Sequence, residues 1–178
     1  MKKYELLMDQ SIKVFGRTLF RIRALVSFSD VEEGEIGGYV EKEDNLDQSG
    51  DAWVYGNAWV YGNAWVCGDA WVCGDARVSG NAQVSGNARV YGDAWVHACR
   101  HIFSAGPIGS RNDTITFFRT KELQIAVKIG CFIGTLAEFR AEVTKAHGDS
   151  MYGKTYQVLA DVAEQWIDLT EDETNASE

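Results

Sequence analysis

Two short stretches near the middle of the chain carry residue types that could do chemistry. His97, Cys99 and His101 alternate along the sequence, so in an extended strand their side chains would point to one side. A histidine can act as the general base in acyl transfer, whereas a closed zinc site would need a fourth ligand that this stretch lacks. We therefore expect no metal site, and His97 is the candidate catalytic base only if the protein is an acyltransferase.

The second stretch, from Gly109 to Thr114, groups hydrogen-bond donors around one cation. Such a loop between two strands could bind an anionic or nucleotide-like ligand, or it could be a turn held by its own Asn and Asp side chains. No cofactor is expected in either case. The candidate ligand-binding residues are Ser110, Arg111, Asn112, Asp113 and Thr114, together with the basic residues Arg100 and Arg119.

Composition and charge exclude several classes of protein. The chain of 178 residues has a formal net charge of −9, which argues against direct nucleic-acid binding because such proteins neutralise phosphates with Lys and Arg. The opening MKKYELLMDQ lacks the apolar stretch of a signal peptide, and no run approaches membrane-spanning length. The four cysteines have no close paired spacing, so we expect a soluble protein in a reducing cytoplasm.

Acidic residues gather between positions 30 and 51. This stretch could be solvated surface, a binding surface for a basic partner, or a DNA-like decoy, and the sequence leaves these interpretations open. Its acidic members before the repeat are Asp30, Glu32, Glu33, Glu35, Glu41, Glu43, Asp44 and Asp47.

Residues 51–98 form eight consecutive six-residue units, DAWVYG NAWVYG NAWVCG DAWVCG DARVSG NAQVSG NARVYG DAWVHA. Within each unit Ala and Val lie two apart, so they share one side of a strand and form the predicted core. The Gly and the Asn or Asp tolerate positive φ and predict a bend every six residues. Because one unit cannot bury a core alone, we expect the chain to coil and stack at a spacing of about 4.8 Å.

This repeat resembles that of the hexapeptide-repeat proteins, whose fold is a left-handed parallel β-helix with three units in each triangular coil. The resemblance implies that residues eighteen apart form columns on the outside. Two faces would then be aromatic, and exposed indoles on a small solenoid predict an interface, which the family commonly uses to form trimers. The predicted homotrimer interface residues are Trp53, Trp59, Trp71, Arg77, Arg89, Trp95, Tyr55, Tyr61 and Tyr91.

The flanking sequences predict a mainly β fold with a cap at each end of the helix. Residues 1–35 predict an N-terminal β cap of three strands, YELLMD, IKVF and RTLFRIRALVSF, ahead of a β-helix over residues 36–98 whose first coils are degenerate. Residues 99–170 predict an α+β segment, in which a β-hairpin with a third strand precedes two helices. An acidic tail, 171–178, follows.

Both predicted helices show capping or periodicity signals. A capping box from Thr135 to Glu138 starts the first helix and Gly148 ends it, with Phe139, Val143 and Ala146 on one face. The second helix, near 152–167, carries apolar residues at helical spacing. These are Tyr156, Leu159, Val162, Ala163 and Trp166.

The flanks also resemble those of uncharacterised hexapeptide-repeat proteins of bacteriophages and prophages, on the segments LFRIRALVSF, EIGGYVEKEDNL and GPIGSRNDTITFFRT. This resemblance implies the cytoplasm of a bacterial host and a role against host defence. The leading hypothesis is a non-enzymatic, oligomeric binding protein that sequesters a small anionic or nucleotide ligand or blocks a host protein. The alternatives are a hexapeptide-repeat acyltransferase and a structural or virion component.

Overall fold

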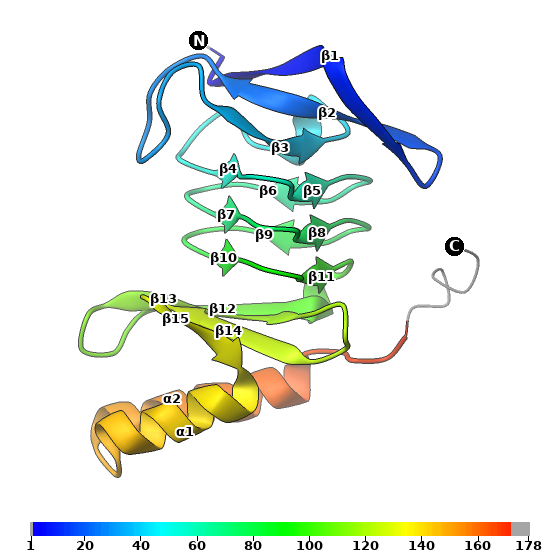
Figure 1. Cartoon of the computed structure of the whole chain (residues 1–178). Coiled ribbons are helices and arrows are strands. Elements are labelled where there is room, and N and C mark those ends of the chain that lie inside the picture. The colour runs from blue at the N-terminus through cyan, green and yellow to red at the C-terminus, as the bar shows by residue number, and fades with distance from the viewer. Residues whose placement is uncertain (1, 172–178) are drawn as a thin grey trace.

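A parallel β-helix forms the middle of the molecule in the computed structural model, which describes residues 2–171 (Figure 1). All of the predicted acidic tail except Glu171 lies outside the described residues. Each hexad contributes one two-residue strand, and strands three hexads apart pair in parallel. These strands are β4 (Trp53–Val54), β5 (Trp59–Val60), β6 (Trp65–Val66), β7 (Trp71–Val72), β8 (Arg77–Val78), β9 (Gln83–Val84), β10 (Arg89–Val90) and β11 (Trp95–Val96).

The predicted columns and core of the helix are confirmed. Register places Arg77 beside both Trp59 and Trp95, so residues eighteen apart do stack. The first Ala and the Val of every hexad are at most 1% exposed. Backbone amides of outward residues donate to carbonyls of core residues in the next coil, as from Tyr55 to Val72 at 2.8 Å, and this bonding holds the coils together.

Glycine is required at the corners where coils lie closest. Gly80 has φ +58°, and a Cβ there would lie 2.2 Å from the carbonyl oxygen of His97 in the coil below. A side chain at this corner would therefore be excluded by both backbone conformation and contact. The same holds at Gly50, where a Cβ would lie 2.4 Å from the carbonyl oxygen of Gly68, whereas a Cβ at Gly86 or Gly92 would meet no non-neighbouring atom of the described chain within 4 Å.

The N-terminal cap is a long hairpin that continues one face of the helix. Strand β1 (Tyr4–Val14) pairs antiparallel with β2 (Arg17–Ala24), which pairs with β3 (Ile36–Val40), and β3 then pairs parallel with β5. The two short strands predicted before the turn at Phe15 and Gly16 are one strand, with a register shift between Leu7 and Ser11. That shift bends the hairpin without breaking it, which is why the sequence pattern there is interrupted.

Two short 3-10 helices, η1 (Glu43–Asn45) and η2 (Cys99–His101), mark the two ends of the β-helix. After η1, Leu46 bridges to Val66 in the place that a hexad Val would take. The buried Asn45 side chain donates to the carbonyl of Ala64 at 2.8 Å. The segment before Asp51 therefore completes a coil without the hexad sequence.

The C-terminal module is a four-stranded antiparallel sheet with two helices on the side away from the solenoid (Figure 1). The sequence predicted three strands, but a turn at Gly130, with φ +50°, produces a fourth. Phe118 on one side of the sheet joins the solenoid core, whereas Phe117 on the other joins the core beneath the helices. Its elements are β12 (Ile102–Ile108), β13 (Asp113–Arg119), β14 (Ile125–Ile129), β15 (Phe132–Thr135), α1 (Leu136–His147) and α2 (Met151–Trp166).

The helix ends are as predicted, but the apolar faces are partly different. The Thr135–Glu138 capping box and the Gly148 C-cap are both present. Ala146 is exposed, and so are Val162 and Trp166, because a narrower row faces the sheet and α1. The buried α2 residues are Gly153, Tyr156, Ala160 and Ala163. Neither helix of the described chain is long and apolar enough to cross a membrane.

Lys3 joins the N-terminal strand to the first coil. Its ammonium group donates to the carbonyls of Gly50 and Ala52, at 3.2 and 2.9 Å. Burial lowers the pKa of Lys3 to about 8, although the carboxylate of Asp47 opposes this shift. The N-terminal cap is thus attached to the first coil through the Lys3 ammonium, whose charged form is destabilised by burial.

Two tryptophans at the same hexad position should differ strongly in their contribution to stability. Trp53 has no exposed surface and Trp65 is 41% exposed. We expect Trp53→Ala to lower the free energy of unfolding by about 3–5 kcal/mol, because it leaves a cavity, and the matched Trp65→Ala by about 1 kcal/mol or less. Urea unfolding followed by circular dichroism measures both, and equal losses would contradict the assigned burial.

The pH dependence of stability should contain a Lys3 contribution. Below pH 8 the Lys3 amine is protonated in both the folded and the unfolded chain. Between about pH 8 and 10.5 it is protonated more fully in the unfolded chain, so the free energy of unfolding rises with pH in that window. We expect the free energy of unfolding of the wild type, minus that of Lys3→Met, to increase from pH 8 to 10.5. Parallel pH profiles in urea unfolding would contradict this expectation.

Candidate functional site

Outward residues of one helix face form a column in which aromatic rings alternate with cations. The Arg77 guanidinium lies 4.4 Å from the Trp59 ring centroid and 5.0 Å from that of Trp95. Tyr39, in the degenerate coil, extends the column and has Arg21 at 4.3 Å from its ring. The sequence did not identify Tyr39 or Arg21 as members, because their segments lack the hexad pattern. These contacts stabilise the column within the chain.

The second predicted column is partly covered by the cap. The Arg89 guanidinium lies 3.7 Å from the Trp71 ring centroid. Trp53, above them, is fully buried, with the rings of Tyr4 and Phe28 at 6.2 and 5.5 Å. The prediction that Trp53 belongs to an oligomer interface is therefore wrong, because the N-terminal strands cover the first coil.

The three predicted interface tyrosines are half-buried against neighbouring side chains of the chain. Tyr55 packs on Trp71 at 5.3 Å, and Tyr61 packs on Phe15 at the tip of the hairpin at 6.4 Å. Tyr91 has the ammonium of Lys128 at 5.3 Å. Burial raises the pKa of Tyr91, so it is a neutral phenol at physiological pH.

His97, the candidate base, is packed at the end of the solenoid. Its Nδ1 is hydrogen-bonded to the Ser79 hydroxyl one coil above. Its ring lies 5.7 Å from that of Trp95 and 5.9 Å from that of His101, whose Nδ1 accepts the His97 backbone N–H at 3.1 Å. Within residues 2–171, no group of three His, Cys, Asp or Glu side chains is placed to hold a metal ion.

The predicted ligand-binding residues do not come together, because the β12–β13 hairpin separates them. Asp113 begins β13 and Arg119 ends it, which puts them about 20 Å apart. Arg119 is buried and donates to the carbonyls of Trp95 and Thr170, at 3.3 and 2.9 Å. Arg100, near the same end, donates to the carbonyl of Trp166 at 3.3 Å. The structure therefore does not place the candidate ligand-binding residues in one joint pocket.

The loop itself is an exposed turn. Ser110, Arg111 and Asn112 are exposed, and Asn112 has φ +51°. The Asp113 carboxylate accepts the backbone N–H of Thr114 at 3.1 Å. These features match the interpretation of a turn held by its own side chains, and they leave the guanidinium of Arg111 facing solvent.

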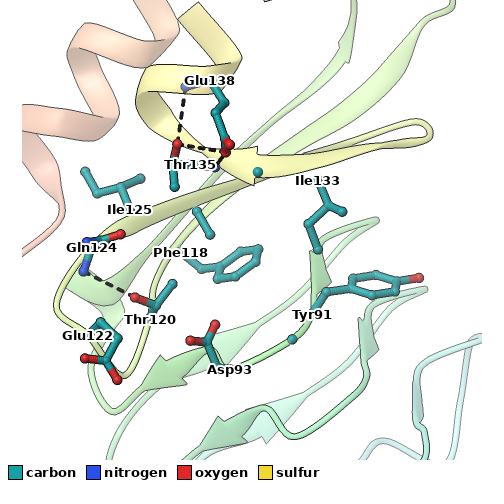
Figure 2. Close-up of a pocket in the computed structure, with 13 residues that line it drawn as sticks. Tyr91, Asp93, Phe118, Thr120, Glu122, Gln124, Ile125, Ile133, Thr135 and Glu138 are labelled. Atoms are coloured by element: carbon teal, nitrogen blue, oxygen red, sulfur yellow. Dashed lines mark hydrogen bonds between the residues drawn. The ribbon is translucent and has the colours of Figure 1, made fainter.

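A cleft of about 260 Å³ opens where the last coil meets the C-terminal sheet (Figure 2). Phe118, 1% exposed, forms its interior, and Figure 2 shows Ile133 of the edge strand β15 pointing down toward Tyr91. The backbone N–H of Lys121 donates to the Asp93 carbonyl at 3.0 Å and joins the two sides. The lining residues are Tyr91, Gly92, Asp93, Phe118, Thr120, Glu122, Gln124, Ile125, Ala126, Ile133, Gly134, Thr135 and Glu138.

The charged residues that line this cleft are all carboxylates: Asp93, Glu122 and Glu138. The Glu138 carboxylate accepts the Thr135 backbone N–H at 2.7 Å and its hydroxyl at 2.9 Å, and these bonds lower its pKa. The three carboxylates outnumber the Lys128 ammonium that lies over the Tyr91 ring, so the edge of the cleft is net negative. A net negative edge around an apolar interior suits a cation with an apolar stem.

The sequence did not predict this cleft, although all three of its carboxylates lie in recognisable sequence features. Asp93 lies at a hexad corner, Glu122 in the turn between β13 and β14, and Glu138 in the capping box of α1. They line one cleft only because the sheet folds back beneath the last coil, and no sequence pattern reports that arrangement.

Comparison with known families supports the repeat architecture. The family model described as the YdcK beta solenoid repeat matches residues 52–68, 70–84 and 82–98. A search of the curated proteins finds no match for the chain. The match, together with the stacked coils, shows that this is a β-solenoid repeat protein.

Proposed function

We propose that this chain is a non-enzymatic, oligomeric binding protein whose cleft accepts a basic side chain of a partner protein. The observation that carries this proposal is the ring of three carboxylates around the apolar cleft at Phe118. The methylene stem of a Lys or Arg would contact the exposed Ile133 and the Tyr91 ring, which line the cleft with Phe118, and its charged head would reach the carboxylates. The net charge of −9 adds long-range attraction for such a partner.

The packing of His97 supports binding over catalysis. A general base must reach the proton that it removes. The His97 Nδ1 is engaged by Ser79, and the ring is flanked by Trp95 and His101. The acyltransferase alternative would have to use the other ring nitrogen, Nε2, which is buried and out of reach of a substrate in this arrangement.

The biological setting of the proposal comes from the resemblance of the flanks to phage and prophage proteins. In that setting the partner is a host protein in the bacterial cytoplasm, and binding blocks it as part of counter-defence. The acid-lined cleft favours the blocking of a host protein over the sequestration of an anionic or nucleotide ligand, because the carboxylates would repel an anion.

We further propose that the chain assembles as a homotrimer through its aromatic faces. Trp59, Trp71 and Trp95 keep part of their surface exposed beside their stacked partners, and Trp65 is exposed on the third face. Such indoles are unusual on a monomer surface of this size. Burial against neighbouring copies would remove them from water.

Isothermal titration with a short peptide of lysine and arginine tests the cleft. We expect saturable binding that weakens with added salt, and the double variant Asp93→Asn, Glu122→Gln should bind at least about tenfold more weakly. Its matched control is Asp75→Asn, Glu32→Gln, which removes the same charge. Asp75 is exposed at the same hexad position one coil above Asp93.

Equal weakening in the two double variants would assign the binding to overall charge and reject the cleft. Absence of binding by the wild type would reject the proposal as well. Saturable binding of ATP that is lost in Arg111→Gln would instead move the function to the Gly109–Thr114 loop.

Sedimentation equilibrium tests the assembly separately. We expect the mass of three chains at micromolar concentration, because apolar faces drive association. A monomer mass up to high micromolar concentration would contradict the trimer and would leave the proposal for the cleft unaffected.

A further inference from the structure

A larger cavity, of about 400 Å³, lies at the far end of the C-terminal module, and it shares no residue with the cleft. It lies where α1 crosses the turn between β14 and β15. Its volume is within the range of pockets that enclose small organic ligands, roughly 300–1,000 Å³. The lining residues are Ile129, Cys131, Phe132, Phe139, Glu142, Val143, Ala146, His147 and Tyr156.

Aromatic rings follow one another around this cavity. The Phe139 ring centroid lies 5.7 Å from that of Phe132 and 6.0 Å from that of Tyr156. The Tyr156 ring in turn lies 5.6 Å from the His147 ring. Phe139 and Tyr156 are 4% and 7% exposed, so the wall is held in place by the core beneath the helices.

The polar end of Tyr156 points away from this cavity, toward the Gly109–Thr114 loop. A Cβ at Gly109 would lie 1.7 Å from the Tyr156 hydroxyl oxygen, so the phenol packs directly on the loop backbone. Burial raises the pKa of this phenol, and the nearby Asp113 carboxylate does so as well. The neutral Tyr156 ring therefore forms part of the cavity wall, and the interior of the cavity is apolar.

Charge is confined to the mouth of the cavity. The Glu142 side chain is 54% exposed and pairs with Lys145 at 3.3 Å. His147 is half-buried near the end of α1, and Cys131 is exposed in the turn. A carboxylate at the mouth disfavours an anionic substituent and favours an amine.

We propose that this cavity binds a small planar aromatic molecule of one or two fused rings, whose polar substituent is neutral or cationic. Such a ring would complete the ring-to-ring contacts of Phe132, Phe139 and Tyr156 in offset or edge-to-face geometry. A substituent at the mouth would meet the Glu142 carboxylate. This site is independent of the cleft and of the proposed partner protein.

Nuclear magnetic resonance of protein with labelled isoleucine and valine methyls tests the site with three probes that share one ring system: indole, tryptamine and indole-3-acetate. We expect indole and tryptamine to shift the methyl resonances of Ile129 and Val143 saturably, and indole-3-acetate to bind about tenfold more weakly than tryptamine. Absence of saturable shifts at these methyls, or equal affinity for the two charged probes, would overturn the proposal.

A pair of matched variants locates the binding. Ala146 lines the cavity and Ala141 does not, although both are exposed on α1. We expect Ala146→Trp to fill the cavity and weaken tryptamine binding at least about tenfold, with Ala141→Trp close to wild type. Equal effects of the two would overturn the assignment.

Two further variants keep the test informative if Ala146→Trp fails to fold. Glu142→Lys, at an exposed position, should reverse the preference between tryptamine and indole-3-acetate, and an unchanged preference would contradict the role of the mouth. The cleft variant Asp93→Asn, Glu122→Gln should leave tryptamine binding unchanged. Failure of the cleft proposal and failure of this one are thereby distinguished.

Discussion

The rest of this structure depends on the stacking of identical coils, in which Ala and Val fill the interior while backbone amides of one coil donate to carbonyls of the next. Because both interactions repeat every eighteen residues, they require every outward side chain to sit above its counterpart. Columns of aromatic rings and guanidinium groups follow directly from this geometry. The Arg77 column is one example, because the stacked backbone places the Arg77 guanidinium between the rings of Trp59 and Trp95.

A stack of coils has two open ends, and the segments outside the repeat cover both of them. At one end the hairpin encloses Trp53 with Tyr4 and Phe28. At the other, Phe118 of the four-stranded sheet completes the solenoid core. A sheet has two faces, however, so its second face needs its own cover, and α1 and α2 supply it. The aromatic cavity lies within the C-terminal module that this second requirement creates, and the cleft lies where that module meets the last coil.

The distribution of charge also follows from the stack. Several cations are engaged on rings along its faces: Arg21 on Tyr39, Arg77 between two indoles, and Lys121 at 5.9 Å from Trp95. Carboxylates make no such contact on an aromatic column, because the negative face of a ring repels them. At the base of the solenoid this leaves Asp93, Glu122 and Glu138 around the cleft, where a basic group of another molecule can take the place that cations of the chain occupy elsewhere.

The sequence by itself determined the stacked β coils, the alanine and valine core, and the ends of α1, because each depends on local periodicity or capping within a few residues. The number of hexads in each coil was implied by the resemblance to hexapeptide-repeat proteins, and the parallel pairing of strands three hexads apart agrees with it. It did not determine the burial of Trp53, the fourth strand of the C-terminal sheet, or the separation of Asp113 from Arg119. The sequence did not determine the two sites either. Asp93 and Glu138 come from a hexad corner and a helix start, and Phe132 and His147 come from the start of strand β15 and the end of α1. Only the tertiary structure decides such contacts, because they join elements whose sequence patterns carry no information about each other.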